Sequence, residues 1–398
     1  MNASLLVAIQ FGTSLIFLLS AISVATAGDL SPYEPKNDSV VLERLPTIPY
    51  SRDQLVAVRK ELTRNPKNVQ LAATAASSYI NVAKSTGDPR FLGYARAAIE
   101  GWWDDPDPPA TILEFRAKLK ERDHDFKGAI GDLQLFSKKE PENAQALVDL
   151  ANIYRVIGDY EQANEAVEQL SAFGTEFQTA VCRIPIMAVT GFAHEAYDLT
   201  GAQLPFARQS IPDSVSWLLV MQADLARILG DFDLADRHYQ ECLKDSPSNR
   251  YARRAYGEFL LKRGRAKEAL KMLGEPDSDN GALVLATIAA SRSGRTSLAE
   301  NWKFMVERRF EELRLRGGKP HGRFESQFLL EIHGVPEEAL AVALTTWSHQ
   351  KEATDSYNVL AAALAAGDAD AAIPVIDFLR ESGTEDSELL TLVKRLRK

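Results

Sequence analysis

The chain has few of the side chains that carry catalysis and metal binding. Its 398 residues include two cysteines, Cys182 and Cys242, and six histidines. No two histidines lie three or four positions apart, so no helix face would present a pair of imidazoles to a metal ion. Gly317-Gly318-Lys319 lacks the earlier glycine of a phosphate-binding loop, and no Gly-x-Ser-x-Gly motif occurs. We therefore expect no enzymatic activity, no cofactor and no metal site.

Positive charge is also scarce. The chain has 46 Lys and Arg against 55 Asp and Glu, a net charge of −9. A non-specific nucleic-acid binder needs a clear excess of cations, because these neutralise the phosphates. We therefore expect no nucleic-acid partner. The remaining composition, 45% apolar and 25% charged, is that of an ordinary globular protein.

Long apolar runs are absent except near the N-terminus. Residues 1–27 carry no charged side chain, and residues 11–24 are strongly apolar. Ala25 and Ala27 place small residues where a signal peptidase reads them. This pattern predicts a signal peptide cleaved after Ala27 and an exported protein, periplasmic or secreted. The alternative is an uncleaved membrane anchor, for which the uninterrupted run is shorter than the ~20 residues that a span needs.

What the sequence does contain is paired amphipathic runs, seen best in residues 144–170. The first run has an apolar stripe formed by Leu147, Leu150, Ala151 and Tyr154. The second run, after Gly158-Asp159, has a stripe formed by Tyr160, Ala163, Val167 and Leu170. Steps of three and four residues place each stripe on one face of a helix. Two helices joined by so short a turn run antiparallel and pack on each other.

This pair resembles a tetratricopeptide repeat (TPR). The small residue, aromatic, turn, aromatic and alanine of that family fall on Ala151, Tyr154, Gly158, Tyr160 and Ala163. Similar turns occur at His124, Gly158, Gly230, Gly264, Gly334 and Gly367. These positions differ by 34, 72, 34, 70 and 33 residues, which are multiples of about 34–36. The resemblance implies an all-α fold, a right-handed α-solenoid of about nine TPR-like helix pairs with a C-terminal capping helix.

The expected organisation has four parts. A signal peptide at 1–27 and a Pro-rich extended arm at 28–50 precede a solenoid at 51–385, and residues 386–398 form the capping helix. The fourth pair, 178–190 with 192–200, is irregular because it contains Pro185, and we expect a loop from there to Asp213. Cys182 and Cys242 are expected to remain thiols, because stacked helices lie ~8–10 Å apart, farther than a disulfide spans.

Candidate binding residues come from the first helix of each pair, which lines the concave groove of a TPR superhelix. The position two or three residues before the turn is basic in six repeats: Lys84, Arg122, Arg155, Arg227, Lys262 and Arg292. We call these six the cationic ladder. Nearby inner positions include Asn81, Asn152 and Trp217. Some TPR proteins hold a peptide's carboxylates with such residues, so the resemblance implies that these nine bind a partner such as an acidic or C-terminal peptide.

One alternative to binding remains open for the cationic ladder, and a second basic group is a separate candidate. A cation in the last turn of a helix is stabilised by the macrodipole by about 0.3–1 kcal/mol. Repeated helices would therefore place a cation at the same position in each repeat even without a ligand. Residues 308–323 hold a second basic group, including Arg308 and Arg323, that could meet an anionic partner or a lipid surface. The simpler interpretation of this group is a solvated helix with Arg308 and Glu312 paired four residues apart.

The function expected from these features is a non-enzymatic interaction scaffold that presents its concave groove to a peptide or protein. The chain looks like bacterial periplasmic TPR proteins. Two alternatives stay open. One is an accessory subunit or enzyme whose catalytic groups converge from distant repeats. The other is a structural spacer, with membrane contact only if the N-terminal segment is not cleaved.

Overall fold

The computed structural model describes Asn37 and residues 52–86, 88, 90–275, 279–315 and 321–397. The chain divides into two units, Met1–Leu45 and Pro46–Lys398, and all elements described below belong to the second. The predicted signal peptide and, apart from Asn37, the predicted arm lie outside the described residues. Among the residues that are described, none forms a helix with the length and apolarity needed to cross a bilayer.

The described part of the second unit is all-α, as predicted. After a single helix, α1 (Arg52–Arg64), nine antiparallel pairs follow in chain order. The first five pairs are α2 (Val69–Thr86) with α3 (Arg90–Ala98), α4 (Ala110–Arg122) with α5 (Phe126–Lys139), α6 (Ala144–Ile157) with α7 (Tyr160–Ser171), α8 (Glu176–Met187) with α9 (Ala193–Ser210), and α10 (Val215–Ile228) with α11 (Phe232–Asp245).

The last four pairs lead to a final single helix. They are α12 (Arg250–Lys262) with α13 (Ala266–Leu273), α14 (Asn280–Arg292) with α15 (Thr296–Leu315), α16 (Gly322–Phe328) with α17 (Pro336–Trp347), and α18 (Ala353–Ala366) with α19 (Ile373–Ser382). The final helix is α20 (Ser387–Leu396). The TPR-like solenoid predicted from the repeat spacing is thereby confirmed.

The turns inside the pairs follow from local sequence. All six predicted turn residues have positive φ, from 61° at His124 to 84° at Gly230. Glycine adopts this conformation readily, and His124 is the one non-glycine residue of the described chain that has it. In the turns after α4, α6 and α10, an aspartate follows and its side chain accepts a hydrogen bond from a backbone N–H of the next helix. Such an N-cap satisfies one otherwise unpaired donor and starts the second helix.

One expected loop is helical instead. We expected the second helix of the fourth pair to end near Thr200, but α9 continues to Ser210 through Pro205. Proline removes one helical hydrogen bond and crowds the carbonyl four residues before it. Here Gln203 and Ala207 are buried on the face that packs against α10. Tertiary packing therefore outweighs the local preference of the proline.

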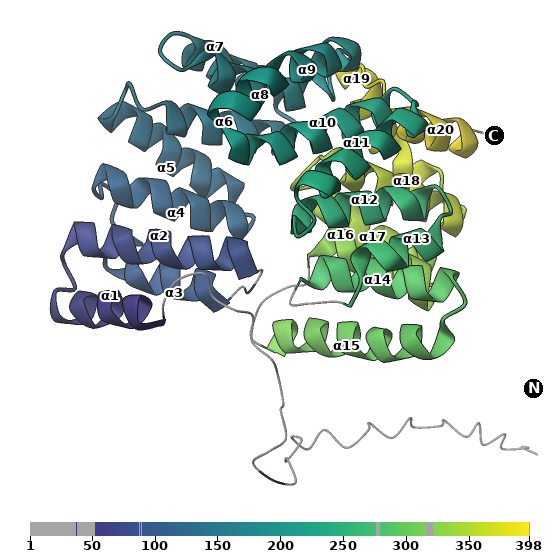
Figure 1. Cartoon of the computed structure of the whole chain (residues 1–398), viewed down its shortest axis with the longest axis horizontal. Helices are drawn as coiled ribbons and strands as arrows, with labels where there is room; N and C mark the ends of the chain where they lie inside the picture. The colour runs from purple at the N-terminus through teal and green to yellow at the C-terminus, as the bar shows by residue number, and fades with distance from the viewer. Residues whose placement is uncertain are drawn as a thin grey trace, which may run out of the picture. The chain divides into compact units, whose positions relative to one another are not determined.

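The last repeats return toward the middle of the chain. In Figure 1 the pairs from α2 to α15 follow an arc, and α16 to α20 then turn back until α20 meets α10. α20 also packs along α18, through Leu389, Leu392 and Val393. Solenoid repeats normally contact only their sequence neighbours. This chain adds contacts between repeats that are far apart in sequence.

We call these distant contacts together the seam. It joins the turn ends of the first five pairs to residues 250–387. At the first two pairs, the Arg250 guanidinium donates to the carbonyl of Thr86 (2.8 Å), and the rings of His124 and His321 lie 5.1 Å apart between centroids. At the third pair, the Lys351 N–H donates to the carbonyl of Val156 (2.7 Å). At the fourth and fifth pairs, the Ala193 N–H donates to Glu385 (2.8 Å) and the Ser387 hydroxyl donates to the carbonyl of Arg227 (3.1 Å).

The surroundings of the turn glycines show which turns the seam covers. A Cβ added to Gly158 would lie 2.9 Å from Lys351, and one added to Gly191 would lie 2.8 Å from the carbonyl oxygen of Gly383. The same atom on Gly264 or Gly294 would have nothing within 4 Å. The turn edge of the early repeats is therefore buried against the end of the chain, whereas that of the later repeats faces open space.

Both cysteines are free thiols, as expected. Cys242 is buried and Cys182 is half-buried. Burial raises the pKa of both thiols, that of Cys182 to about 11. The two groups therefore pack as small apolar side chains.

Candidate functional site

A cavity of about 710 Å³ is lined by the first helices of four successive pairs. Its walls come from α6, α8, α10 and α12, and the first residues of α16 and α18 complete it. Its aromatic lining consists of Phe177, Trp217, Tyr239, Tyr251, Phe259 and Phe324. The cavity thus lies on the side of the repeats where the TPR resemblance places a groove.

Five of the nine predicted partner-binding residues line this cavity: Asn152, Arg155, Trp217, Arg227 and Lys262. The other four lie elsewhere. Asn81 and Lys84 are exposed on α2, and Arg122 is exposed at the end of α4. Arg292, at the end of α14, donates to Glu331 (2.6 Å) and to the carbonyl of Leu261 (3.1 Å). The structure therefore brings together the middle of the predicted set and leaves its two ends apart.

Asn152 and Arg155 connect distant repeats within one polar chain. The Asn152 amide donates to Glu121 on α4 (3.2 Å) and accepts from Arg155 (3.0 Å). Arg155 also donates to Glu352, 197 positions later, at 3.3 Å. Both residues are therefore held by carboxylates of this chain rather than left free in the groove.

Glu352 is shared with a second arginine. Arg323, at the start of α16, donates to Glu352 at 2.6 Å and to both oxygens of Asp355 at 3.0 and 2.8 Å. Burial would raise the pKa of Glu352, but Arg323 and Arg155 outweigh it and lower that pKa to about 2. This carboxylate therefore stays ionised in the folded protein at any ordinary pH.

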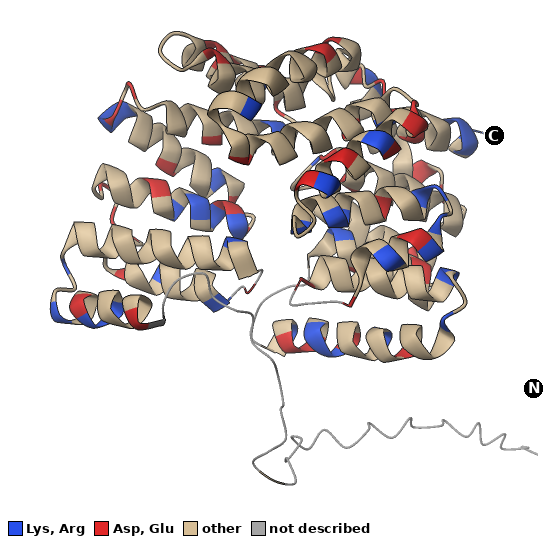
Figure 2. Ribbon diagram, in the orientation of Figure 1, with Lys and Arg blue, Asp and Glu red and all other residues tan. Residues whose placement is uncertain are grey.

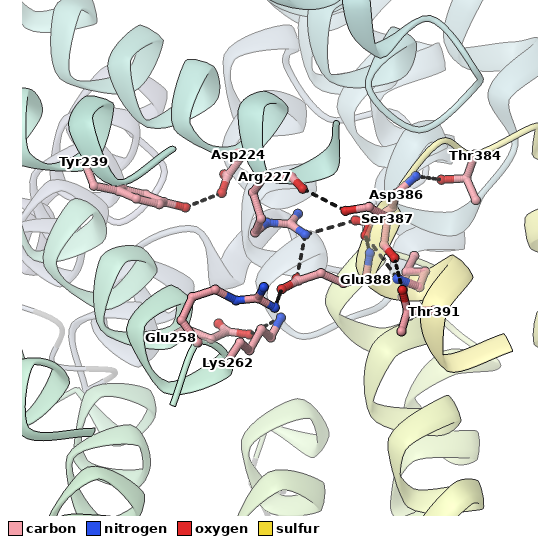
Figure 3. A network of polar contacts seen from close by, with 12 residues as sticks. Asp224, Arg227, Tyr239, Glu258, Lys262, Thr384, Asp386, Ser387, Glu388 and Thr391 are labelled. Carbon is pink, nitrogen blue, oxygen red and sulfur yellow. Dashed lines mark hydrogen bonds and ion pairs between the residues drawn. The ribbon is translucent and has the colours of Figure 1, made fainter. Parts of the chain in front are cut away.

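Arg227 is at the centre of a second cluster, drawn in Figure 3. Its Nη1 atom donates to Asp386 (3.1 Å) and to Glu388 (2.9 Å), and Arg263 donates to the other oxygen of Glu388 (2.6 Å). The side chains of Arg227, Asp386 and Glu388 are 13%, 4% and 6% exposed. Burial would lower the pKa of Arg227, but Asp386, Asp224 and Glu388 raise it well above its ordinary value.

Lys262 is paired on its own helix. It lies 3.1 Å from Glu258 and 4.2 Å from the centre of the Tyr357 ring, a cation–π contact. Burial would raise the pKa of Glu258, but Lys262 and Arg323 lower it. Nearby, burial raises the pKa of Asp224, whose carboxylate accepts a hydrogen bond from Tyr239. Figure 2 shows residues of both charges interspersed along the helices of the later repeats.

Sequence reasoning missed the carboxylates that meet the ladder. Glu352, Asp386 and Glu388 were not singled out, and Arg263 was passed over although it follows Lys262 directly. A signal existed in the run Glu385-Asp386-Ser387-Glu388, whose charge is opposite to that of the ladder. Nothing in the sequence relates that run to α10, because 159 positions separate Arg227 from Asp386.

The basic group at 308–323 divides into unrelated parts. Arg308 lies 3.6 Å from Glu312, which confirms the predicted pair on a solvated helix. Arg314 pairs with Glu311 and Glu325, while Arg323 is inside the cluster around Glu352. Arg316 and Lys319 lie outside the described residues. Within the described residues, no three His, Cys, Asp or Glu side chains are grouped so that they could hold a metal ion.

Comparison with known families finds a match in the middle of the chain. A family model described as tetratricopeptide repeat matches residues 220–274, which span most of α10 to α13. This stretch of the chain is similar to the tetratricopeptide repeat family. The match covers most of the fifth pair and the sixth. A search of curated protein sequences finds no match.

Several solved structures resemble this chain at low identity. PilW, described as a type IV pilus biogenesis factor, is 16% identical, with a TM-score of 0.40 over 51% of this chain and 94% of its own. A tetratricopeptide repeat protein from Parabacteroides merdae ATCC 43184 is 15% identical, with a TM-score of 0.42 over 65% and 98%. A Rap protein complexed with Competence and Sporulation Factor is 13% identical, with a TM-score of 0.47 over 87% and 94%.

Proposed function

We propose that this protein is a non-enzymatic scaffold that binds a peptide or protein partner in the 710 Å³ cavity, and that the partner presents acidic residues. TPR proteins bind protein and peptide partners, typically without catalysis of their own. The observation that carries the proposal is the cavity itself, which gathers Asn152, Arg155, Trp217, Arg227 and Lys262 from three of its four first helices, α6, α10 and α12. Acidic chemistry is favoured because all three of these cations already contact carboxylates.

The cavity lining suits a peptide better than a small molecule. Aromatic side chains such as Trp217 and Tyr251 supply large contact area at low entropic cost and are frequent hot spots of interfaces. Tyr251 is 48% exposed, although it lines the cavity, so its ring is open to a ligand.

A matched pair of tyrosines tests the proposal. Peptides selected from a displayed random library on the purified protein are expected to be rich in Asp and Glu and to lose at least about tenfold in affinity on Tyr251→Ser. Tyr94→Ser is the control, because Tyr94 is equally exposed, at 48%, but lies on α3 outside the cavity. Fluorescence anisotropy measures both affinities. Equal binding to the two variants would place the binding surface elsewhere and contradict the proposal.

We also propose that the protein is exported to the periplasm or secreted, with its signal peptide cleaved after Ala27. The support is the charge-free apolar segment followed by small residues at the cleavage positions. N-terminal sequencing of the protein recovered from the exported fraction should begin at Gly28. A protein that begins at Met1 and sediments with membranes would favour an uncleaved anchor instead.

A further inference from the structure

The start of α20 carries a run of acidic residues that contacts three earlier helices. We call Glu385-Asp386-Ser387-Glu388 the acidic segment. Glu385 accepts from the backbone N–H of Ala193 at the start of α9 (2.8 Å). Asp386 and Glu388 accept from Arg227 at the end of α10, and Glu388 also accepts from Arg263, just after α12. The segment therefore bridges the fourth, fifth and sixth pairs.

Arg227 belongs both to this contact and to the cavity. Its two ion pairs use the same atom, Nη1, and its side chain also lines the cavity. Lys262, the next member of the ladder, lines the cavity too, and Glu388 contributes to raising its pKa. A carboxylate brought into the cavity would thus meet Arg227, one of the two arginines that hold the acidic segment.

We propose that the acidic segment is an internal occupant of the cationic ladder, and that an acidic partner competes with it for Arg227. The inference rests on the proposed function, since it concerns how access to the same site is controlled. The segment has the chemistry expected of the partner: carboxylates two residues apart that meet cations from neighbouring repeats. Binding of a partner and release of α20 are then coupled, and by thermodynamic linkage each favours the other.

The fold makes release of α20 feasible. α20 is ten residues long, ends at Leu396, and is preceded by Gly383 with φ of 70°. Its apolar anchors are Leu389, Leu392 and Val393 against α18. Elements with few buried apolar anchors open at free energies below that of global unfolding. The charged contacts are therefore a substantial part of what keeps α20 closed.

A substitution that keeps the shape of the segment but removes its charge tests the proposal. In D386N/E388Q the asparagine can still cap α20, because Asn is as good an N-cap as Asp. The probe is a fluorescent peptide of residues 384–398 with the natural sequence. We expect it to bind the D386N/E388Q chain at least tenfold more tightly than the natural chain. D377N/E381Q, which removes two charges from α19, is the control and should bind the probe as the natural chain does.

Two results would overturn the inference. One is a D386N/E388Q chain that has the natural circular dichroism spectrum but binds the probe no more tightly. If that variant does not fold, hydrogen exchange of the natural chain decides. A saturating acidic peptide from the library should accelerate exchange of amides 387–396, and unchanged exchange in its presence contradicts the inference. That second result leaves the proposed function intact, because the function is judged by the difference between Tyr251→Ser and Tyr94→Ser.

Discussion

At the scale of single residues, the structure distinguishes two roles for the ladder cations, stabilisation by the helix dipole and pairing with carboxylates. Arg155, Arg227 and Lys262 each contact a carboxylate of this chain, so helix-dipole stabilisation alone does not describe them. Removing one member of a buried ion pair leaves the other charged and desolvated, which costs about 3–5 kcal/mol. Charge-reversal of these arginines would therefore lower stability as well as binding, and a loss of binding alone would not identify a ligand site.

Glu352 gives a pH dependence that can be predicted. Its pKa is about 2 in the folded protein and near 4.5 without its partners. The folded state therefore binds fewer protons between these values, so the stabilisation is complete above pH 4.5 and is lost as the pH falls toward 2. Glu352→Gln should lower the free energy of unfolding at pH 7 by on the order of 2 kcal/mol. The difference from the natural chain should shrink below pH 4.5.

Urea unfolding at pH 7, 4.5 and 3 measures this effect. Glu338→Gln is the control, since Glu338 is exposed on α17 and its substitution should leave the stability curve unchanged. A Glu352→Gln variant as stable as the natural chain at pH 7 would show that the ion pairs of Glu352 with Arg155 and Arg323 contribute no net stability.

At the scale of elements, most of the helices could be predicted and their partners could not. Apolar stripes at three- and four-residue steps and short turns are local signals. They predicted the pairs and six turn residues, each of which has positive φ. The predicted end of α9 was wrong, because the burial of Gln203 and Ala207 outweighs the helix-breaking preference of Pro205. The position of α20 on α10 depends on contacts between Arg227 and residues about 160 positions later, which have no periodic signature.

Two turn glycines of the same conformation test the seam. Gly191 and Gly294 both have positive φ, 82° and 77°, so alanine at either position bears similar backbone strain. A Cβ at Gly191 would also lie 2.8 Å from the carbonyl oxygen of Gly383, whereas one at Gly294 meets nothing within 4 Å. Gly191→Ala should therefore destabilise the protein by about 1–3 kcal/mol more than Gly294→Ala. Chemical denaturation measures the free energy of unfolding of both variants. Equal losses would show that the backbone at Gly383 moves away from a Cβ at position 191 without a cost in stability.

At the scale of the whole second unit, the seam changes how the solenoid should unfold. A repeat array with only neighbour contacts is quasi-one-dimensional, and its ends can unfold independently. Here the turn ends of the first five pairs bond to residues between Arg250 and Ser387, so early and late repeats share interactions. Opening one part removes contacts from the other. Unfolding should consequently be more cooperative than the repeat architecture alone implies.

This cooperativity can be measured by hydrogen exchange at increasing urea concentration. Exchange in α4 to α7 and in α16 to α20 should rise together in the natural chain, because the polar chain from Glu121 through Arg155 and Glu352 to Arg323 joins them. In Arg155→Met the two regions should separate, and the late repeats should exchange at lower urea. Arg183→Met is the control: Arg183 pairs with Glu168 on the neighbouring α7, so its loss leaves the seam intact and the two regions coupled. Separate transitions already present in the natural chain would show that the seam contacts are too weak to couple the repeats that they connect.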